Sequence, residues 1–183
     1  MIIFTSLIHT LDVWVLHGLY SLRTFENTLF FIGVSELGTV ATITGVTAGL
    51  VLWLMTTERY ARALALAATV GGTGLAVTAL KYLFARPRPS EFFQAYPEIW
   101  HSFPSWHAAG TAALAVYISL VLVSALALRT RRIVQALAVS VALAVGFSRA
   151  FLGVHYASDV LAGWIIGGAF AYGAYYLLKR FGK

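Results

Sequence analysis

The chain has no cysteine and few charged residues. Without thiols it can form neither disulfides nor thiolate metal sites, and it offers no cysteine nucleophile. Only 11% of its 183 residues are charged, whereas 60% are hydrophobic. Because a soluble domain carries about 25% charged residues, this composition excludes an ordinary soluble protein. Most of the protein surface must therefore face lipid.

Negative charge is scarcer than positive charge, which leaves a net charge of +6. The basic residues fall in short clusters between apolar runs, a pattern that favours membrane topology over a nucleic-acid patch, so no nucleic-acid partner is expected. Alternating helices place three clusters on one face: Arg59 and Arg62; Arg129, Arg131 and Arg132; and Lys179, Arg180 and Lys183. The positive-inside rule predicts that this face is the cytoplasmic side of the inner (cytoplasmic) membrane.

Five apolar runs are each close to the roughly 20 residues that cross a bilayer as a helix. They cover about 37–55, 61–84, 105–128, 133–151 and 158–178. No period-2 barrel pattern is present, and helices satisfy their own backbone groups in hydrocarbon. The sequence predicts an all-α integral membrane bundle of five to six transmembrane helices, with residues 1–183 forming one domain.

The N-terminal stretch, about 2–21, differs from these runs. Its apolar residues recur at helical spacing with His9, Asp12 and His17 largely between them, which predicts an amphipathic helix lying in the membrane interface. The alternative is a sixth span whose Asp12 and His17 face protein. Polar residues interrupt the stretch and no small-residue cleavage site follows, so a removable signal peptide is not expected.

The segment 85–104 carries all four prolines and five aromatic residues: Phe92, Phe93, Tyr96, Trp100 and Phe103. Such a segment cannot cross lipid as a helix. Its aromatic side chains are expected to form an interfacial belt or the wall of an opening for a lipid headgroup, and the two roles are compatible.

Gly163 and Gly167 form a small-xxx-small pair on the last predicted helix. Packing within the chain explains such a pair as well as dimerisation does. We therefore expect a monomer or a weak homodimer.

Three polar segments fall on the face opposite the basic clusters, where the topology rule gives them no role. They contribute Lys81 and Arg88; Ser105 and His107; and Ser148, Arg149, His155 and Asp159. Ionisable groups within membrane segments are costly and usually mark a functional site. Guanidinium forks and an ammonium group suit a phosphate. Arg86 is instead expected to anchor lipid headgroups.

Ser105 directly follows Pro104 at the start of an apolar helix. Free backbone N–H groups and the helix dipole favour an anion there. The hydroxyl can also act as the N-cap of the helix, and both roles can hold.

His155 and Asp159 are four residues apart, so on a helix they share one face. The carboxylate can accept one imidazole N–H and leave the other nitrogen as a nucleophile. A His–Asp pair could also bind a metal, but no further carboxylate is apparent in the site, so we expect no metal. His9, His17 and His101 are expected to be structural.

The three segments resemble the signature motifs of the type 2 phosphatidic acid phosphatase superfamily, over about 81–159. The resemblance implies that His155 forms a phosphohistidine, that His107 is the general acid and base, and that Asp159 orients His155. It assigns five residues to phosphate binding: Lys81, Arg88, Ser105, Ser148 and Arg149. It implies no cofactor.

One residue departs from the family pattern. Trp106 stands where the middle motif commonly has glycine, and it is expected to shape the pocket or to face the lipid part of the substrate. The resemblance implies a lipid phosphatase acting at the periplasmic or outer face on undecaprenyl diphosphate, phosphatidylglycerol phosphate or phosphatidic acid. The alternatives are a lipid A phosphatase, a lipid phosphotransferase, and a non-catalytic anion or lipid transporter.

Overall fold

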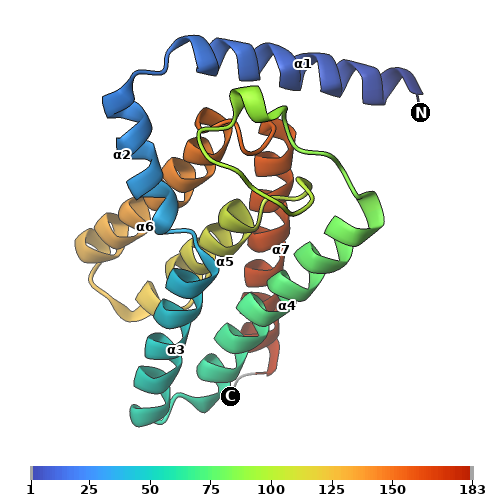
Figure 1. The fold of residues 1–183 in the computed structure, drawn as a ribbon. Coiled ribbons are helices and arrows are strands. Elements are labelled where there is room, and N and C mark those ends of the chain that lie inside the picture. The colour runs from blue at the N-terminus through green and yellow to red at the C-terminus, as the bar shows by residue number, and fades with distance from the viewer. Residues whose placement is uncertain (1, 182–183) are drawn as a thin grey trace.

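The computed structural model describes residues 2–181. This part of the chain consists of helices and connecting loops, without a strand. The helices are α1 (Ile2–Ser21), α2 (Phe25–Glu36), α3 (Val40–Thr56), α4 (Tyr60–Phe84), α5 (Trp106–Leu120), α6 (Leu128–Phe151) and α7 (Ala157–Phe181), with short 3-10 turns η1 (Glu91–Phe93) and η2 (Leu122–Ala125). The predicted all-α bundle is confirmed (Figure 1).

Five helical segments among the described residues are long and apolar enough to cross a membrane. They are Phe25–Thr56, Tyr60–Phe84, Trp106–Ala125, Leu128–Phe151 and Ala157–Phe181. Four of these match the predicted spans closely. The first is longer than predicted because α2 precedes α3, with a break at 37–39. Thr24 starts α2 with a reciprocal capping box to Asn27, a local signal that the hydropathy of the segment does not reveal.

Helix α1 is present as predicted, but it is not one of the five candidate spans. Figure 1 shows it lying across one end of the bundle, so the sixth-span alternative is wrong. The side chains of Asp12 and Leu16 are buried, whereas Leu7, Leu11 and Trp14 are more than half exposed. Asp12 thus faces protein without the helix spanning the membrane. The place of α1 in the membrane interface stays a prediction.

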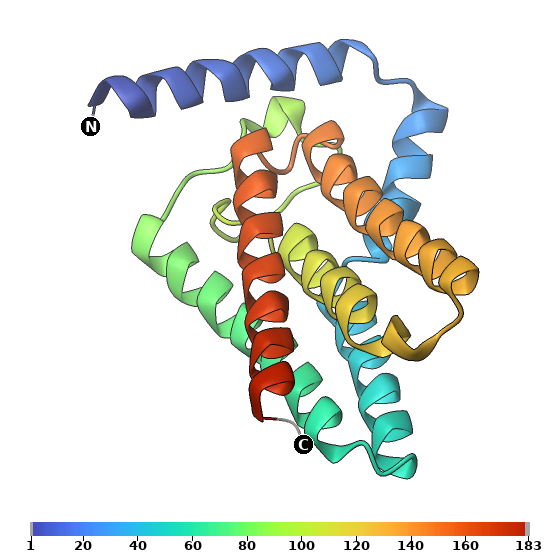
Figure 2. The same ribbon diagram turned by 180° about the vertical axis from the view of Figure 1, so that it is seen from behind.

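Helix α5 forms the centre of the bundle and packs against α3, α4, α6 and α7 (Figures 1 and 2). Its span is 61% buried, compared with 22 to 33% for the other four. A Cβ atom added to Gly163 or Gly167 of α7 would lie 2.6 Å from the carbonyl oxygen of Ser105 or 2.0 Å from that of Ala109. The glycine pair therefore serves close packing of α7 on α5 within the chain.

The outer helices present large apolar side chains to their surroundings. Leu64 and Leu75 on α4 and Ile165 on α7 are each more than 70% exposed. Such exposure is expected for helices whose solvent is lipid. The fold is that of a multi-pass membrane protein.

The end of the bundle away from α1 carries the basic clusters. Arg59, Arg62 and Lys179 line one cavity there, together with residues at the end of α5 and in η2, and η2 leads directly into α6, where Arg129 lies. Lys183 lies outside the described residues. The predicted grouping of these charges on one face is supported, and its cytoplasmic orientation stays a prediction.

Candidate active site

The three polar segments meet around one pocket of about 440 Å³. Six of the nine residues predicted for the site line it: Lys81, Arg88, Trp106, His107, Arg149 and His155. The other three, Ser105, Ser148 and Asp159, are fully buried and are not part of its lining. Glu98 and Trp100 from the proline-containing loop also line the pocket. Of the five aromatic residues of the loop, Trp100 thus forms part of the pocket wall, and an opening for a lipid headgroup stays a prediction.

His155 lies in the connection between α6 and α7, and Asp159 lies in the first turn of α7. The expectation that both share a helical face is wrong in its local detail, because His155 precedes the helix. They meet through the turn, in which the backbone N–H of Tyr156 donates to Oδ2 of Asp159 at 2.9 Å. Nδ1 of His155 lies 3.5 Å from the same oxygen.

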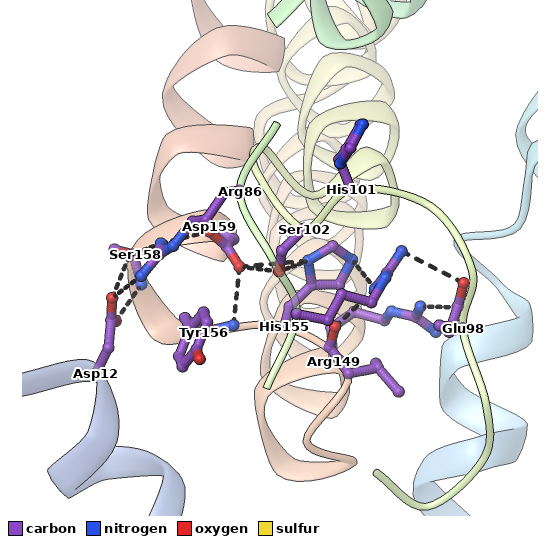
Figure 3. A network of polar contacts seen from close by, with 12 residues as sticks. Asp12, Arg86, Glu98, His101, Ser102, Arg149, His155, Tyr156, Ser158 and Asp159 are labelled. Atoms are coloured by element: carbon purple, nitrogen blue, oxygen red, sulfur yellow. Dashed lines mark hydrogen bonds and ion pairs between the residues drawn. The ribbon is translucent and has the colours of Figure 1, made fainter. Parts of the chain in front are cut away.

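Ser102 links this pair and was not anticipated from the sequence. Its hydroxyl donates to Oδ2 of Asp159 at 2.5 Å, and its oxygen lies 3.4 Å from Nδ1 of His155 (Figure 3). The serine oxygen can thus accept a hydrogen bond from the Nδ1–H of His155 while its hydroxyl donates to the carboxylate of Asp159. Its only sequence signal is its place three residues before Ser105, in the same loop.

The opposite imidazole nitrogen faces the pocket. Nε2 of His155 lies 3.3 Å from Nη1 of Arg88. Burial, only partly opposed by the bond to Asp159, lowers the pKa of His155 to about 3. At neutral pH the ring is therefore uncharged, and with its proton on Nδ1 it has a free electron pair on Nε2.

Glu98 holds two of the predicted phosphate-binding cations. Its carboxylate accepts from Nη2 of Arg149 and, at 3.4 Å, from Nη2 of Arg88. Although burial opposes its charge, Arg149 and Arg88 lower the pKa of Glu98 and keep it ionised. The expectation that the site has no further carboxylate is wrong, because Glu98 of the proline-containing loop lines the pocket.

Arg149 is 1% exposed, and both of its Nη atoms donate to protein groups. Nη1 donates to the hydroxyls of Ser35, at 2.8 Å, and of Tyr96. Its Nε is buried without a partner. Arg88 donates to the carbonyl oxygens of Trp100 and Val154 at 2.5 and 2.6 Å. Both guanidinium groups are fixed before any ligand arrives.

Lys81 comes from the last turn of α4. Its ammonium group donates to the carbonyl oxygen of His101 and lies 3.5 Å from that of Ser102. Lys81 therefore holds the loop that carries Ser102 as well as lining the pocket.

The two serines predicted to bind phosphate, Ser105 and Ser148, differ in the hydrogen bonds of their side chains. Ser105 occupies the N-cap position of α5, but its side chain makes no capping bond and its Oγ is buried without a partner. The expected side-chain cap is therefore wrong, and a role of Ser105 in phosphate binding stays a prediction. Ser148 donates to the carbonyl oxygen of Val145 at 2.7 Å within α6. A role of Ser148 in phosphate binding stays a prediction.

Trp106 forms part of the pocket wall between α5 and α4. A Cβ atom on Gly74 or on Gly110 would lie 3.3 Å from its indole ring, so both glycines make room for it. The indole Nε1 is buried without a partner. His107 is packed equally closely, because a Cβ atom on Gly38, between α2 and α3, would lie 3.0 Å from its Cδ2.

Arg86 is not a lipid anchor, in contrast to the expectation. Its Nη1 donates to Oδ1 of Asp159 at 2.6 Å, and its Nη2 donates to Oδ2 of Asp12 at 2.7 Å. Burial opposes its charge, but the carboxylates of Asp159 and Asp12 raise the pKa of Arg86. The hydropathy pattern could not reveal this, since the partners lie on α1 and α7.

Among the residues that the structure describes, no three His, Asp or Glu side chains come together as a candidate metal site. Glu98 and Asp159 each pair with arginine.

Solved structures with a similar fold include the following two. The crystal structure of a transmembrane PAP2-type phosphatidylglycerolphosphate phosphatase from Bacillus subtilis aligns with a TM-score of 0.87 at 23% identity, over 95% of this chain and 87% of that one. The crystal structure of Aquifex aeolicus LpxE aligns with a TM-score of 0.70 at 24% identity, over 90% of this chain and 94% of that one. At such identities these matches establish the fold.

Sequence comparison adds a curated relative and a family. Phosphatidylglycerophosphatase B of Bacillus subtilis (strain 168) is 37% identical over 90 residues, which cover 48% of this chain and 44% of that protein's length. Residues 62–183 match the PAP2 superfamily. That match includes most of the pocket lining and extends over more than half of the chain. This protein therefore belongs to the PAP2 superfamily.

Proposed function

We propose that the protein is a membrane-embedded lipid phosphatase that works through a phosphohistidine at His155. The observation that carries the proposal is the convergence of a neutral, oriented imidazole and the cations Lys81, Arg88 and Arg149 on one pocket. A phosphate group needs such fixed donors, and phosphoryl transfer depends mainly on positioning and on stabilising charge.

In the first step Nε2 of His155 attacks phosphorus. The N–P bond forms while the bond from phosphorus to the lipid oxygen breaks, and the electron pair of that bond leaves with the oxygen. His107, on the same pocket, donates a proton to this leaving oxygen. Lys81, Arg88 and Arg149 stabilise the negative charge of the transferring group, and Ser105, Ser148 and backbone groups complete the predicted phosphate site.

In the second step water attacks the phosphohistidine. His107 now accepts a proton from water, the N–P bond breaks, and its electron pair returns to Nε2 of His155. The products are the dephosphorylated lipid and inorganic phosphate. Asp159, through Ser102, keeps the proton of His155 on Nδ1 throughout both steps. No step requires a metal ion or a cofactor.

The apolar side of the pocket suits the lipid part of the substrate. Val40 from α3, Val77 from α4 and Trp106 from α5 contribute apolar surface to it. The candidate substrates are phosphatidylglycerol phosphate, undecaprenyl diphosphate and phosphatidic acid, with lipid A phosphate as a further possibility. Phosphatidylglycerol phosphate is the first to test, because a curated relative carries the name phosphatidylglycerophosphatase B.

The site is proposed to lie on the periplasmic or outer face of the cytoplasmic membrane. It lies at the end of the bundle that α1 covers (Figure 1), whereas Arg59, Arg62 and Lys179 gather at the other end. The positive-inside rule predicts that the end with these basic residues faces the cytoplasm.

The experiment is phosphate release by the detergent-purified protein in EDTA, from a panel of these four lipids. His155→Ala is the test variant and His101→Ala is its control, because the ring of His101 points away from the network in Figure 3. We expect release that His155→Ala abolishes, that His101→Ala retains and that EDTA does not affect. Full activity of His155→Ala would overturn the mechanism. Loss of activity in EDTA would overturn the metal-free chemistry. Transfer of phosphate to an added lipid alcohol in place of water would favour a phosphotransferase.

A further inference from the structure

Asp12 is a buried carboxylate on the outermost helix of the protein. It is 3% exposed, and its side chain accepts hydrogen bonds from Arg86 and Ser158, at the end of the bundle that carries the site. Its Oδ1 accepts the backbone N–H of Ser158 at 2.9 Å, and its Oδ2 accepts the Ser158 hydroxyl at 2.6 Å and the Arg86 guanidinium at 2.7 Å. A carboxylate is costly to bury without such partners.

Arg86 joins this carboxylate to that of Asp159. One Nη atom donates to Asp12, and the other donates to Asp159 at 2.6 Å and to the Ser158 hydroxyl at 2.7 Å. The guanidinium also lies over the ring of Tyr156, 4.3 Å from its centroid. Its planar fork is thus fixed in direction by groups on α1, on α7 and in the turn that precedes α7.

The two oxygens of Asp159 have separate partners. Oδ1 faces Arg86, while Oδ2 faces Ser102, Tyr156 and Nδ1 of His155. Rotation of the carboxylate about its Cβ–Cγ bond would move both oxygens together. The bond from Arg86 to Oδ1 therefore restricts where Oδ2 can lie, and Oδ2 is the oxygen that orients His155 (Figure 3).

We propose that Asp12 and Arg86 are positioning residues for catalysis, and that they hold the Asp159 carboxylate at the angle that orients His155. The inference rests on the proposed function, because it concerns the efficiency of the His155 nucleophile. Neither residue lines the pocket, so both act through Asp159. Helix α1, which the family match over 62–183 does not include, thereby becomes part of the active site.

Docking of α1 has supports that are independent of Asp12. Leu16, one turn further along, is 5% exposed. Arg23, just after α1, donates to the carbonyl oxygens of Phe151 and Phe93 at 2.6 Å each. Removal of the Asp12 carboxylate should therefore change the direction of Arg86 while leaving α1 in place. The positioning of Asp159 can thus be tested separately from the docking of α1 on the bundle.

The test compares kcat and KM of Asp12→Ala, Asp12→Asn and Arg86→Gln with those of the wild type, on the lipid that the wild type dephosphorylates best. Leu16→Ala is the matched control, since it weakens a buried contact of the same helix without touching Arg86. We expect kcat to fall roughly tenfold in Asp12→Ala and Arg86→Gln, with KM within about twofold, because displaced catalytic groups slow the chemical step. Asp12→Asn should lose less, because an amide oxygen can still accept from Ser158.

The outcomes separate this inference from the proposed function. Unchanged kcat in Asp12→Ala, or an equal fall in Leu16→Ala, would overturn the positioning role. If Asp12→Ala does not fold, Asp12→Asn decides: wild-type kcat in that variant would overturn the proposal, and a severalfold fall at an unchanged melting temperature would support it. A wild-type protein without His155-dependent release would instead overturn the proposed function.

Discussion

Nδ1 of His155 lies 3.5 Å from Oδ2 of Asp159, and the hydroxyl of Ser102 contacts both. The pair therefore does not rely on one short direct bond. The serine gives the imidazole a second acceptor and is one of several donors to the carboxylate, beside Arg86 and the backbone N–H of Tyr156. A hydroxyl between the two groups makes the orientation of the proposed nucleophile depend on the loop that Lys81 holds.

Replacement of Ser102 by alanine should lower kcat by roughly tenfold. It removes a hydrogen bond to a charged, buried group, and such a bond contributes about 1.5 to 3 kcal/mol. We expect part of this energy to be lost from the stabilisation of the transition state, which lowers the rate. KM should stay within about twofold, because Ser102 is not among the pocket residues. Steady-state kinetics check this, with Ser124→Ala at the other end of the bundle as the control. Equal kcat for wild type and Ser102→Ala would contradict the proposed relay.

Glu98→Gln should strengthen the binding of inorganic phosphate. The Glu98 carboxylate now engages Arg149 and Arg88, and it repels an incoming anion. A neutral amide releases both cations, so the inhibition constant for phosphate should fall roughly tenfold, or about 1.4 kcal/mol. Glu91→Gln is the control, since Glu91 is an exposed acid in the same loop. A higher inhibition constant in Glu98→Gln would show that the carboxylate chiefly orders the arginines.

The stability of the wild type should fall on acidification, partly because of His155. Burial lowers the pKa of His155 from 6.5 to about 3 in the folded protein, so below pH 6.5 the unfolded chain binds this proton first. From pH 7 to pH 5 this linkage removes about 2 kcal/mol from the free energy of unfolding. Thermal unfolding in detergent should show a steeper pH dependence for wild type than for His155→Asn. Equal slopes would contradict the lowered pKa.

Gly167→Ala should destabilise the protein, whereas Gly173→Ala on the same helix should not. A Cβ atom at Gly167 would lie 2.0 Å from the carbonyl oxygen of Ala109, but a Cβ atom at Gly173 meets nothing within 4 Å. The first change forces α5 and α7 apart at a cost of about 1 to 3 kcal/mol. Melting temperatures of the two variants in the same detergent measure the difference. Equal melting temperatures for the two variants would show that α5 and α7 can move apart without loss of stability.

Trp106→Gly should widen the pocket while keeping the chemistry. The indole forms part of the wall of the pocket that His107 and His155 also line, and the substitution leaves both histidines in the chain. We expect the ratio of the rate on lipid A phosphate to the rate on phosphatidylglycerol phosphate to rise, while Trp106→Phe stays near wild type. Competition assays with both lipids give this ratio directly. A fall in both rates by the same factor would assign Trp106 to folding.

The sequence alone determined the class of the protein and most of its helices. Scarce charge and long apolar runs leave no other structure in lipid than helices, so four of the five spans agree closely with the structure. The charged residues of the three motifs were equally visible, because ionisable groups stand out against apolar surroundings. Lys81, Arg88, His107, Arg149 and His155 do line one pocket.

The tertiary structure decided which groups those residues contact. The roles of Asp12, Glu98 and Ser102 could not be predicted from their neighbours in the sequence, because each depends on a partner 51 to 146 residues away. Local periodicity describes neighbours three or four residues apart, and it correctly suggested that His155 and Asp159 meet. It could not place α1 across the site, since that contact exists only once Arg86 and α7 have folded around it.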